Sequence, residues 1–137
     1  MPDHHAAQTE LTATLLEHNQ RLLDAIFAGD WKTYAELCDP GLTCFEPEGL
    51  GHLITGLPFH KYYFDLPAGG PATQIQVTMA SPVVRPLGSD AALVLYTRLT
   101  QVVTPSGPVT KRVEETRVWH KQSGGWKLTH VHRSLPG

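Results

Sequence analysis

Long apolar runs, blocks of like charge and clustered cysteines are all missing from this 137-residue chain. No stretch has the length of a membrane span or the apolar core of a signal peptide, so we expect a cytoplasmic location and no membrane partner. The 11 lysines and arginines are spread among 13 aspartates and glutamates, with a net charge of −2, which argues against nucleic acid as a partner. The two cysteines, Cys38 and Cys44, predict reduced thiols rather than a disulfide framework.

Sequence motifs typical of cofactor binding or of covalent catalysis are also missing. The chain has no phosphate-binding glycine loop and no serine or cysteine nucleophile motif. His130 and His132 have the spacing of two metal ligands on one face of a strand, but no third ligand is evident, and packing in an interface is the stronger interpretation. We therefore expect neither a metal ion nor a cofactor.

The residues that are present predict one domain over residues 9–135, after a flexible tail of eight residues. Apolar residues at helical spacing, followed by Gly29, predict a long helix over residues 9–28. Asp30 and Pro58 are suited to the starts of two shorter helices, over residues 31–38 and 58–65.

The second half of the chain changes to the alternating pattern of strands. We expect two short extended segments at 42–46 and 49–55, after an Asp39-Pro-Gly41 turn, and four strands at 74–84, 91–103, 109–121 and 126–134. Helices first and strands afterwards predict an α+β fold, with the helices on one face of an antiparallel sheet.

Three arginines lie in strands that are otherwise largely apolar or aromatic: Arg98, Arg117 and Arg133. An arginine cannot lose its charge inside a protein, so three of them in a half-buried sheet indicate an anion-binding cavity or compensating carboxylates. Glu115 shares a face with Arg117 and is its natural partner. The alternative is structural ion pairing alone, with glutamates at positions 46, 48, 114 and 115.

The opposite strand faces are also apolar, although a domain of this size has helices for only one side of its sheet. Uncovered apolar surface of this kind predicts an oligomer interface. By simple alternation, the interface residues are Leu93, Leu95, Leu99, Val118, Trp126, Leu128, His130 and His132.

Several strings of residues bear a family resemblance. They include Phe45-Glu-Pro-Glu48, Tyr96-x-Arg98-x-Thr-Gln101, Glu114-Glu-Thr-Arg-Val-Trp-His120 and His130-x-His-Arg-Ser134. Together they resemble the association (hub) domain of calcium/calmodulin-dependent protein kinase II over residues 11–134. The string from Glu114 to His120 is the most specific of them.

The resemblance implies a nuclear-transport-factor-2-like cone, in which one long and two short helices pack on a strongly curved antiparallel sheet. It also implies homo-oligomeric rings, commonly of twelve or fourteen subunits, and a pocket for a small carboxylate. The pocket residues that it implies are Arg98, Arg117, Arg133 and His60. Tyr96 is a candidate pocket hydroxyl beside Glu115. Kinase activity is not implied, because the resemblance covers no kinase domain, and association with a separately encoded kinase stays open.

Two classes of function compete for this chain. The first is a hub module whose arginine pocket binds a small carboxylate or another anion. The second is a small cone-fold enzyme, an isomerase, dehydratase or polyketide cyclase acting on a small acidic substrate. Three positive charges lower the pKa of a neighbouring carboxylate and so leave a weak base, which favours the module over the enzyme.

Overall fold

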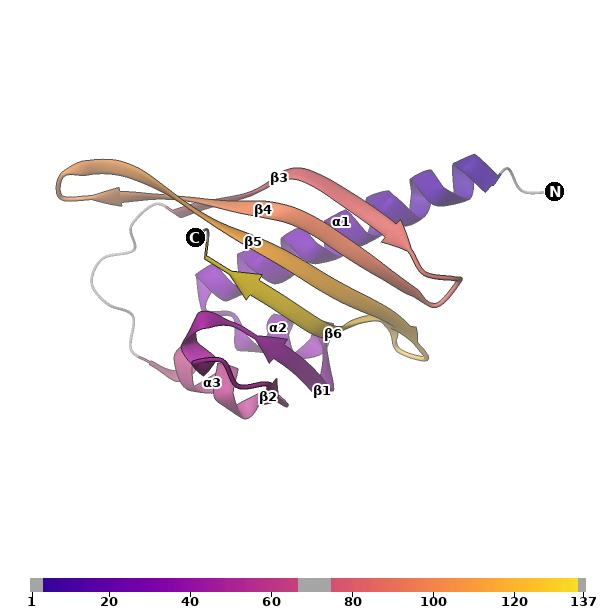
Figure 1. Ribbon diagram of the computed structural model, residues 1–137, viewed down its shortest axis with the longest axis horizontal. Coiled ribbons are helices and arrows are strands. Elements are labelled where there is room, and N and C mark those ends of the chain that lie inside the picture. The colour runs from indigo at the N-terminus through magenta and orange to yellow at the C-terminus, as the bar shows by residue number, and fades with distance from the viewer. Residues whose placement is uncertain (1–3, 67–74, 136–137) are drawn as a thin grey trace.

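The computed structural model describes residues 4–66 and 75–135, and Figure 1 shows how they are arranged. The predicted α+β order is confirmed: the three helices lie in the first half of the chain, with two strands between them, and the four long strands fill the second half. The helices are α1 (His4–Ala28), α2 (Trp31–Leu37) and α3 (Pro58–Asp65), with a short 3₁₀ helix, η1, at Pro47–Gly49. The strands are β1 (Cys38–Phe45), β2 (Ile54–Thr55), β3 (Ile75–Pro86), β4 (Ala91–Thr104), β5 (Gly107–Gln122) and β6 (Gly125–Ser134).

The ends of the helices follow from local chemistry. α1 starts at His4, earlier than the expected residue 9, and so includes residues 4–8 of the predicted tail. It ends before Gly29, whose φ of +69° suits a residue without a side chain. Asp30 then caps α2, because its carboxylate accepts hydrogen bonds from the backbone N–H of Thr33 at 3.2 Å and from the Thr33 hydroxyl at 2.7 Å.

The six strands form one mixed sheet in the order β2-β1-β6-β5-β4-β3. Strands β3 to β6 form the predicted antiparallel meander. β1, however, runs parallel to β6, so the prediction of an antiparallel sheet is wrong for this pair. The physical reason is the connection, since a long crossover through α3 and the meander allows two strands to run in the same direction.

β1 also differs from its expected bounds. It begins at Cys38, so the Asp39-Pro-Gly41 segment lies inside the strand instead of forming a turn before it. The register with β6 shifts between Cys38 and Thr43, and a proline, which has no N–H to donate, is tolerated at such an irregularity. Of the second expected segment, 49–55, only Ile54–Thr55 form a strand, β2, because η1 ends at Gly49 and a turn follows at residues 50–51.

The three helices lie on one face of the sheet, which we call the inner face (Figure 1). α1 packs on β3 and β4, and α2 packs on β1 and β6. Leucines of α1 and side chains from β4 to β6 fill the core between these layers, among them Leu15, Leu22, Leu23, Val94, Trp119 and Leu128. Within the described residues, no helix is both long and apolar enough to cross a membrane.

One irregularity in β6 corrects the expected interface. Val118 is opposite His130 and Trp119 is opposite Leu128, so Thr129 is an extra residue in β6. The bulge reverses the alternation on its N-terminal side. Leu128 is therefore fully buried in the core, and Trp126 packs against the core, instead of both facing outward as predicted.

Candidate ligand-binding pocket

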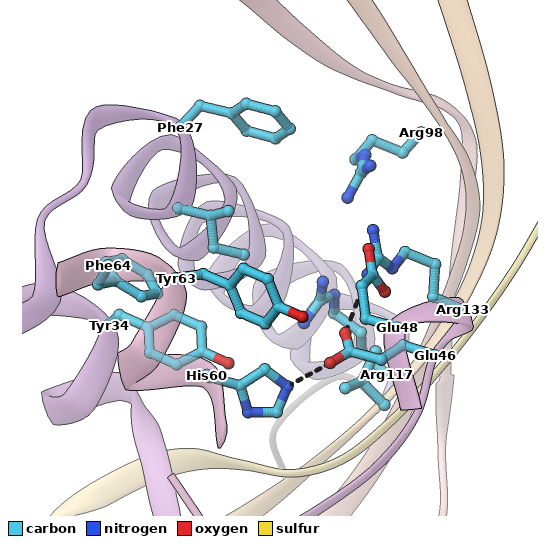
Figure 2. Close-up of a pocket in the computed structure, with 12 residues that line it drawn as sticks. Phe27, Tyr34, Glu46, Glu48, His60, Tyr63, Phe64, Arg98, Arg117 and Arg133 are labelled. Carbon is cyan, nitrogen blue, oxygen red and sulfur yellow. Dashed lines mark hydrogen bonds and ion pairs between the residues drawn. The ribbon is translucent and has the colours of Figure 1, made fainter. Parts of the chain in front are cut away.

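A cavity of about 250 Å³ lies between the helices and the inner face of the sheet. Figure 2 shows the side chains that line it. Strands β4, β5 and β6 contribute one arginine each, two glutamates come from the segment after β1, and the helices supply mostly apolar and aromatic groups. The lining residues are Ile26, Phe27, Tyr34, Glu46, Glu48, His60, Tyr63, Phe64, Arg98, Arg117, Val131 and Arg133.

Behind the cavity, Glu115 joins two of the arginines. Its side chain is fully buried and accepts from Arg98 Nη1 at 2.9 Å and from Arg117 Nη2 at 3.3 Å. The Tyr96 hydroxyl donates to Glu115 and accepts from Arg117 Nε at 2.9 Å. Sequence reasoning placed Tyr96 and Glu115 in the pocket, but the structure places them outside its lining, where they orient the arginines.

The pKa values in this network follow from the competition between burial and charge. Burial alone raises the pKa of Glu115, but Arg117 and Arg98 outweigh it and lower the pKa below the usual value. Burial lowers the pKa of Arg117, but Glu115, Tyr96 and Tyr34 together outweigh that effect and raise it overall. Burial raises the pKa of Tyr96 to about 12. At neutral pH the Glu115 carboxylate is therefore ionised and lies between the guanidinium ions of Arg98 and Arg117, while Tyr96 is neutral.

The third arginine has carboxylates of its own. Arg133 Nη2 donates to Glu46 Oε2 at 2.9 Å and to Glu48 Oε2 at 2.6 Å. Glu46 also accepts from His60 Nε2, at 3.0 Å from Oε1. Burial raises the pKa of Glu46, but the hydrogen bond from His60 and the charges of His60 and Arg133 lower it overall. Glu114, the other partner considered from the sequence, is exposed beside Glu115 and pairs with none of the three arginines.

Two buried side-chain atoms of the described residues have no hydrogen-bond partner, His60 Nδ1 and Arg98 Nε. Both belong to residues that line the cavity. Unsatisfied buried groups are uncommon in proteins and call for a specific explanation, such as a water or a guest. Three arginines face three glutamates here, so the pocket is balanced in charge and still has unused hydrogen-bonding capacity.

An aromatic wall faces the arginines across the cavity (Figure 2). The Arg98 guanidinium lies 5.2 Å from the centre of the Phe27 ring, and Tyr63 and Phe64 of α3 continue the wall. Of the two neighbouring tyrosines of α3, Tyr63 lines the cavity, whereas Tyr62 is 62% exposed. Sequence reasoning missed Phe27, and the available signal was an aromatic residue in the last turn of the helix, two residues before Gly29.

The opposite, outer face of the sheet holds the remaining predicted interface residues. Two rows of aligned residues cross five strands there, each row containing residues that pair in register. One row is Arg85, Leu93, Val118, His130 and Thr43, and the other is Val83, Leu95, Thr116, His132 and Phe45. Leu99 lies on the same face, between Thr78 and Arg112. We call these two rows the outer rows.

Comparison with known proteins gives a consistent result. The family model for the calcium/calmodulin dependent protein kinase II association domain matches residues 11–137. A Caenorhabditis elegans calcium/calmodulin-dependent protein kinase type II is 45% identical over 133 residues, which cover 94% of this chain and 18% of the kinase. The delta subunit of the Oryctolagus cuniculus kinase is 40% identical over 97% of this chain and 28% of its own length. The chain thus spans less than a third of these kinases.

Solved structures agree with this match. The Chlamydamonas reinhardtii CaMKII hub homology domain has 52% identity and a TM-score of 0.88, covering 93% of this chain and 99% of that one. The C. elegans CaMKII association domain has 44% identity and a TM-score of 0.87, covering 94% and 98%. An NTF2-like protein from Salmonella enterica, at 18% identity and a TM-score of 0.72 over 95% and 94%, shows the shared fold alone.

Proposed function

Because the chain belongs to the calcium/calmodulin-dependent protein kinase II association-domain family, we propose that it is a homo-oligomerisation module, a hub, whose arginine pocket binds a small carboxylate. The single observation that supports assembly most directly is the outer face of the sheet. Its two outer rows present mostly neutral side chains, and no described helix covers them. Val83 is 53% exposed and Phe45 is 36% exposed, which is surface that a partner subunit would bury.

The β3 edge of the sheet is less suited to assembly than the outer face. β3 is the last strand, and its register shifts between Ala80 and Val83. Ser81, at a φ of +52°, and Pro82 lie at this irregularity. A bulge and a proline hinder the addition of another strand, so we expect subunits to pack face to face.

Carboxylate binding is supported by the unpartnered Arg98 Nε and by the three arginines and two glutamates among the residues that line the cavity. A guanidinium bound to one carboxylate still has donors for a second. The aromatic wall would cover the apolar body of the guest, and the cavity of about 250 Å³ limits that guest to a small molecule. An enzyme is disfavoured, because the lowered pKa of Glu46 and of Glu115 makes both carboxylates weak bases at neutral pH.

Native mass spectrometry and light scattering on the purified chain test assembly. We expect a particle of many 15.1 kDa subunits, with dodecamers and tetradecamers as the sizes suggested by the family. A monomer at every protein concentration would overturn the hub proposal.

Thermal unfolding with a series of straight-chain monocarboxylates tests the pocket. The melting temperature should rise with chain length until the cavity is filled. Arg98→Lys keeps a positive charge beside Glu115 but removes the unpartnered Nε, and it should lose most of the carboxylate-induced shift. Equal shifts in the variant and the parent protein would contradict the assignment of the pocket.

A further inference from the structure

Beside the arginine cavity, the structure brings together three side chains that commonly bind metals. Cys44 lies near the end of β1, Glu46 follows that strand, and His60 belongs to α3. The cysteine sulfur, a glutamate oxygen and a histidine nitrogen all lie within 4.8 Å of one another. In the described part of the chain, this is the one group of three or more such side chains that could hold an ion.

The geometry is close to that of a tetrahedral zinc site. Zn²⁺ bonds of about 2.0–2.1 Å to nitrogen and oxygen, and about 2.3 Å to sulfur, place neighbouring ligand atoms roughly 3.3–3.6 Å apart. Glu46 Oε1 and His60 Nε2 are 3.0 Å apart and need to separate only slightly. The Cys44 sulfur lies within 4.8 Å of a Glu46 carboxylate oxygen and of a His60 ring nitrogen, so a shift of about 1 Å completes the three-ligand arrangement.

The charges around the cluster also suit a divalent cation. Binding of the ion releases the Cys44 thiol proton to solvent, and the resulting thiolate and the Glu46 carboxylate together neutralise its charge of +2. If Glu46 Oε1 binds an ion, Arg133 still has Glu48 at 2.6 Å, and Arg117 still has Glu115 at 3.3 Å. Each of the three pocket arginines therefore keeps a carboxylate partner.

We propose that Cys44, Glu46 and His60 bind one zinc ion in each chain. Sulfur, imidazole and carboxylate ligands together favour Zn²⁺ over Mg²⁺ or Ca²⁺, which prefer oxygen ligands alone. Glu46 and His60 line the cavity, whereas Cys44 is 1% exposed and lies behind its lining. The fourth position of the ion therefore faces the cavity, where water or a carboxylate could take it. This inference depends on neither assembly nor carboxylate binding.

The experiment is a titration of the chelator-stripped full chain with cobalt(II), followed by zinc competition. Cobalt bound by a thiolate produces a near-ultraviolet charge-transfer band, which histidines and carboxylates elsewhere in the chain do not produce. We expect one cobalt per chain with this band, and its displacement by one equivalent of zinc. The chain has only two cysteines, so Cys38→Ser is a matched control. Both cysteines are buried, and only Cys44 belongs to the cluster.

Cys44→Ser should abolish the band, and Cys38→Ser should leave it unchanged. Glu46→Gln should raise the zinc dissociation constant by at least about tenfold. A parent protein without the band, or the same loss in both cysteine variants, would overturn the proposal. If Cys44→Ser does not fold, X-ray absorption of the zinc-loaded parent protein decides, since one sulfur neighbour supports the site and none refutes it.

Discussion

The two faces of strands β5 and β6 show opposite chemistry over the same few residues. Arg117 and Arg133 point inward to the cavity, while Val118 and His132, their neighbours in sequence, point outward to the outer rows. The inner charges are balanced within the chain by glutamates, whereas the outer face has no described cover. A single chain thus balances the charges of its inner face, whereas no described element covers its outer face.

The inner face should be the more sensitive to a single substitution. Glu115→Gln removes the carboxylate between Arg98 and Arg117 and leaves two guanidinium ions without that partner. Breaking a buried ion pair on one side costs about 3–5 kcal/mol. Glu114→Gln, the adjacent and exposed glutamate, should change the free energy of unfolding by less than about 0.5 kcal/mol. Chemical denaturation at one fixed protein concentration measures the free energy of unfolding of both variants. Equal losses of stability would contradict the prediction that the inner face is the more sensitive.

The outer face should respond through assembly rather than through folding. Leu95→Glu places a charge in an outer row and should weaken each subunit contact by about 1.5–3 kcal/mol, the value of a buried leucine. Light scattering should show smaller particles, while circular dichroism shows a folded chain. Leu50→Glu is the matched control, because Leu50 is 83% exposed and lies outside the outer rows. Full-size particles of Leu95→Glu would place the subunit contact elsewhere.

Acidic pH should destabilise the fold through the ion pairs of the inner face. The pKa of Glu115 and of Glu46 is lowered on folding, so both carboxylates stabilise the fold fully above the ordinary value of 4.5. This stability is lost as the pH falls from that value through the lowered pKa. Each unit of lowering corresponds to about 1.4 kcal/mol. Unfolding free energies measured between neutral and acidic pH should fall more steeply for the parent protein than for Glu115→Gln, and parallel curves would contradict the assignment.

The sequence was sufficient to assign side chains to the two faces of the sheet wherever the strands are regular. β4 and β5 pair without interruption from Ala91 to Thr104, so alternation correctly separated the arginines from Leu93 and Leu95. It failed at Thr129, because one extra residue reverses the faces before it and nothing in the residue itself signals a bulge. The Cys44, Glu46 and His60 cluster was equally hidden, since β1 and α3 meet only in the folded chain.

The edge of the sheet, where the two faces meet, should give the smallest effect. Ser81 adopts a left-handed φ of +52° at the irregularity in β3, a conformation that is strained for residues other than glycine. Ser81→Gly relieves this strain but gains backbone freedom in the unfolded chain, so we expect a stabilisation of at most about 1 kcal/mol. Ser81→Val, which is branched at Cβ, should destabilise by more than that amount. If denaturation shows the two variants to be equivalent, the irregularity is not held in this conformation, and β3 is then open to pairing with another strand. In that case, subunits could pair through the β3 edge as well as through the outer rows. The outer face would then no longer be the single expected site of contact between subunits.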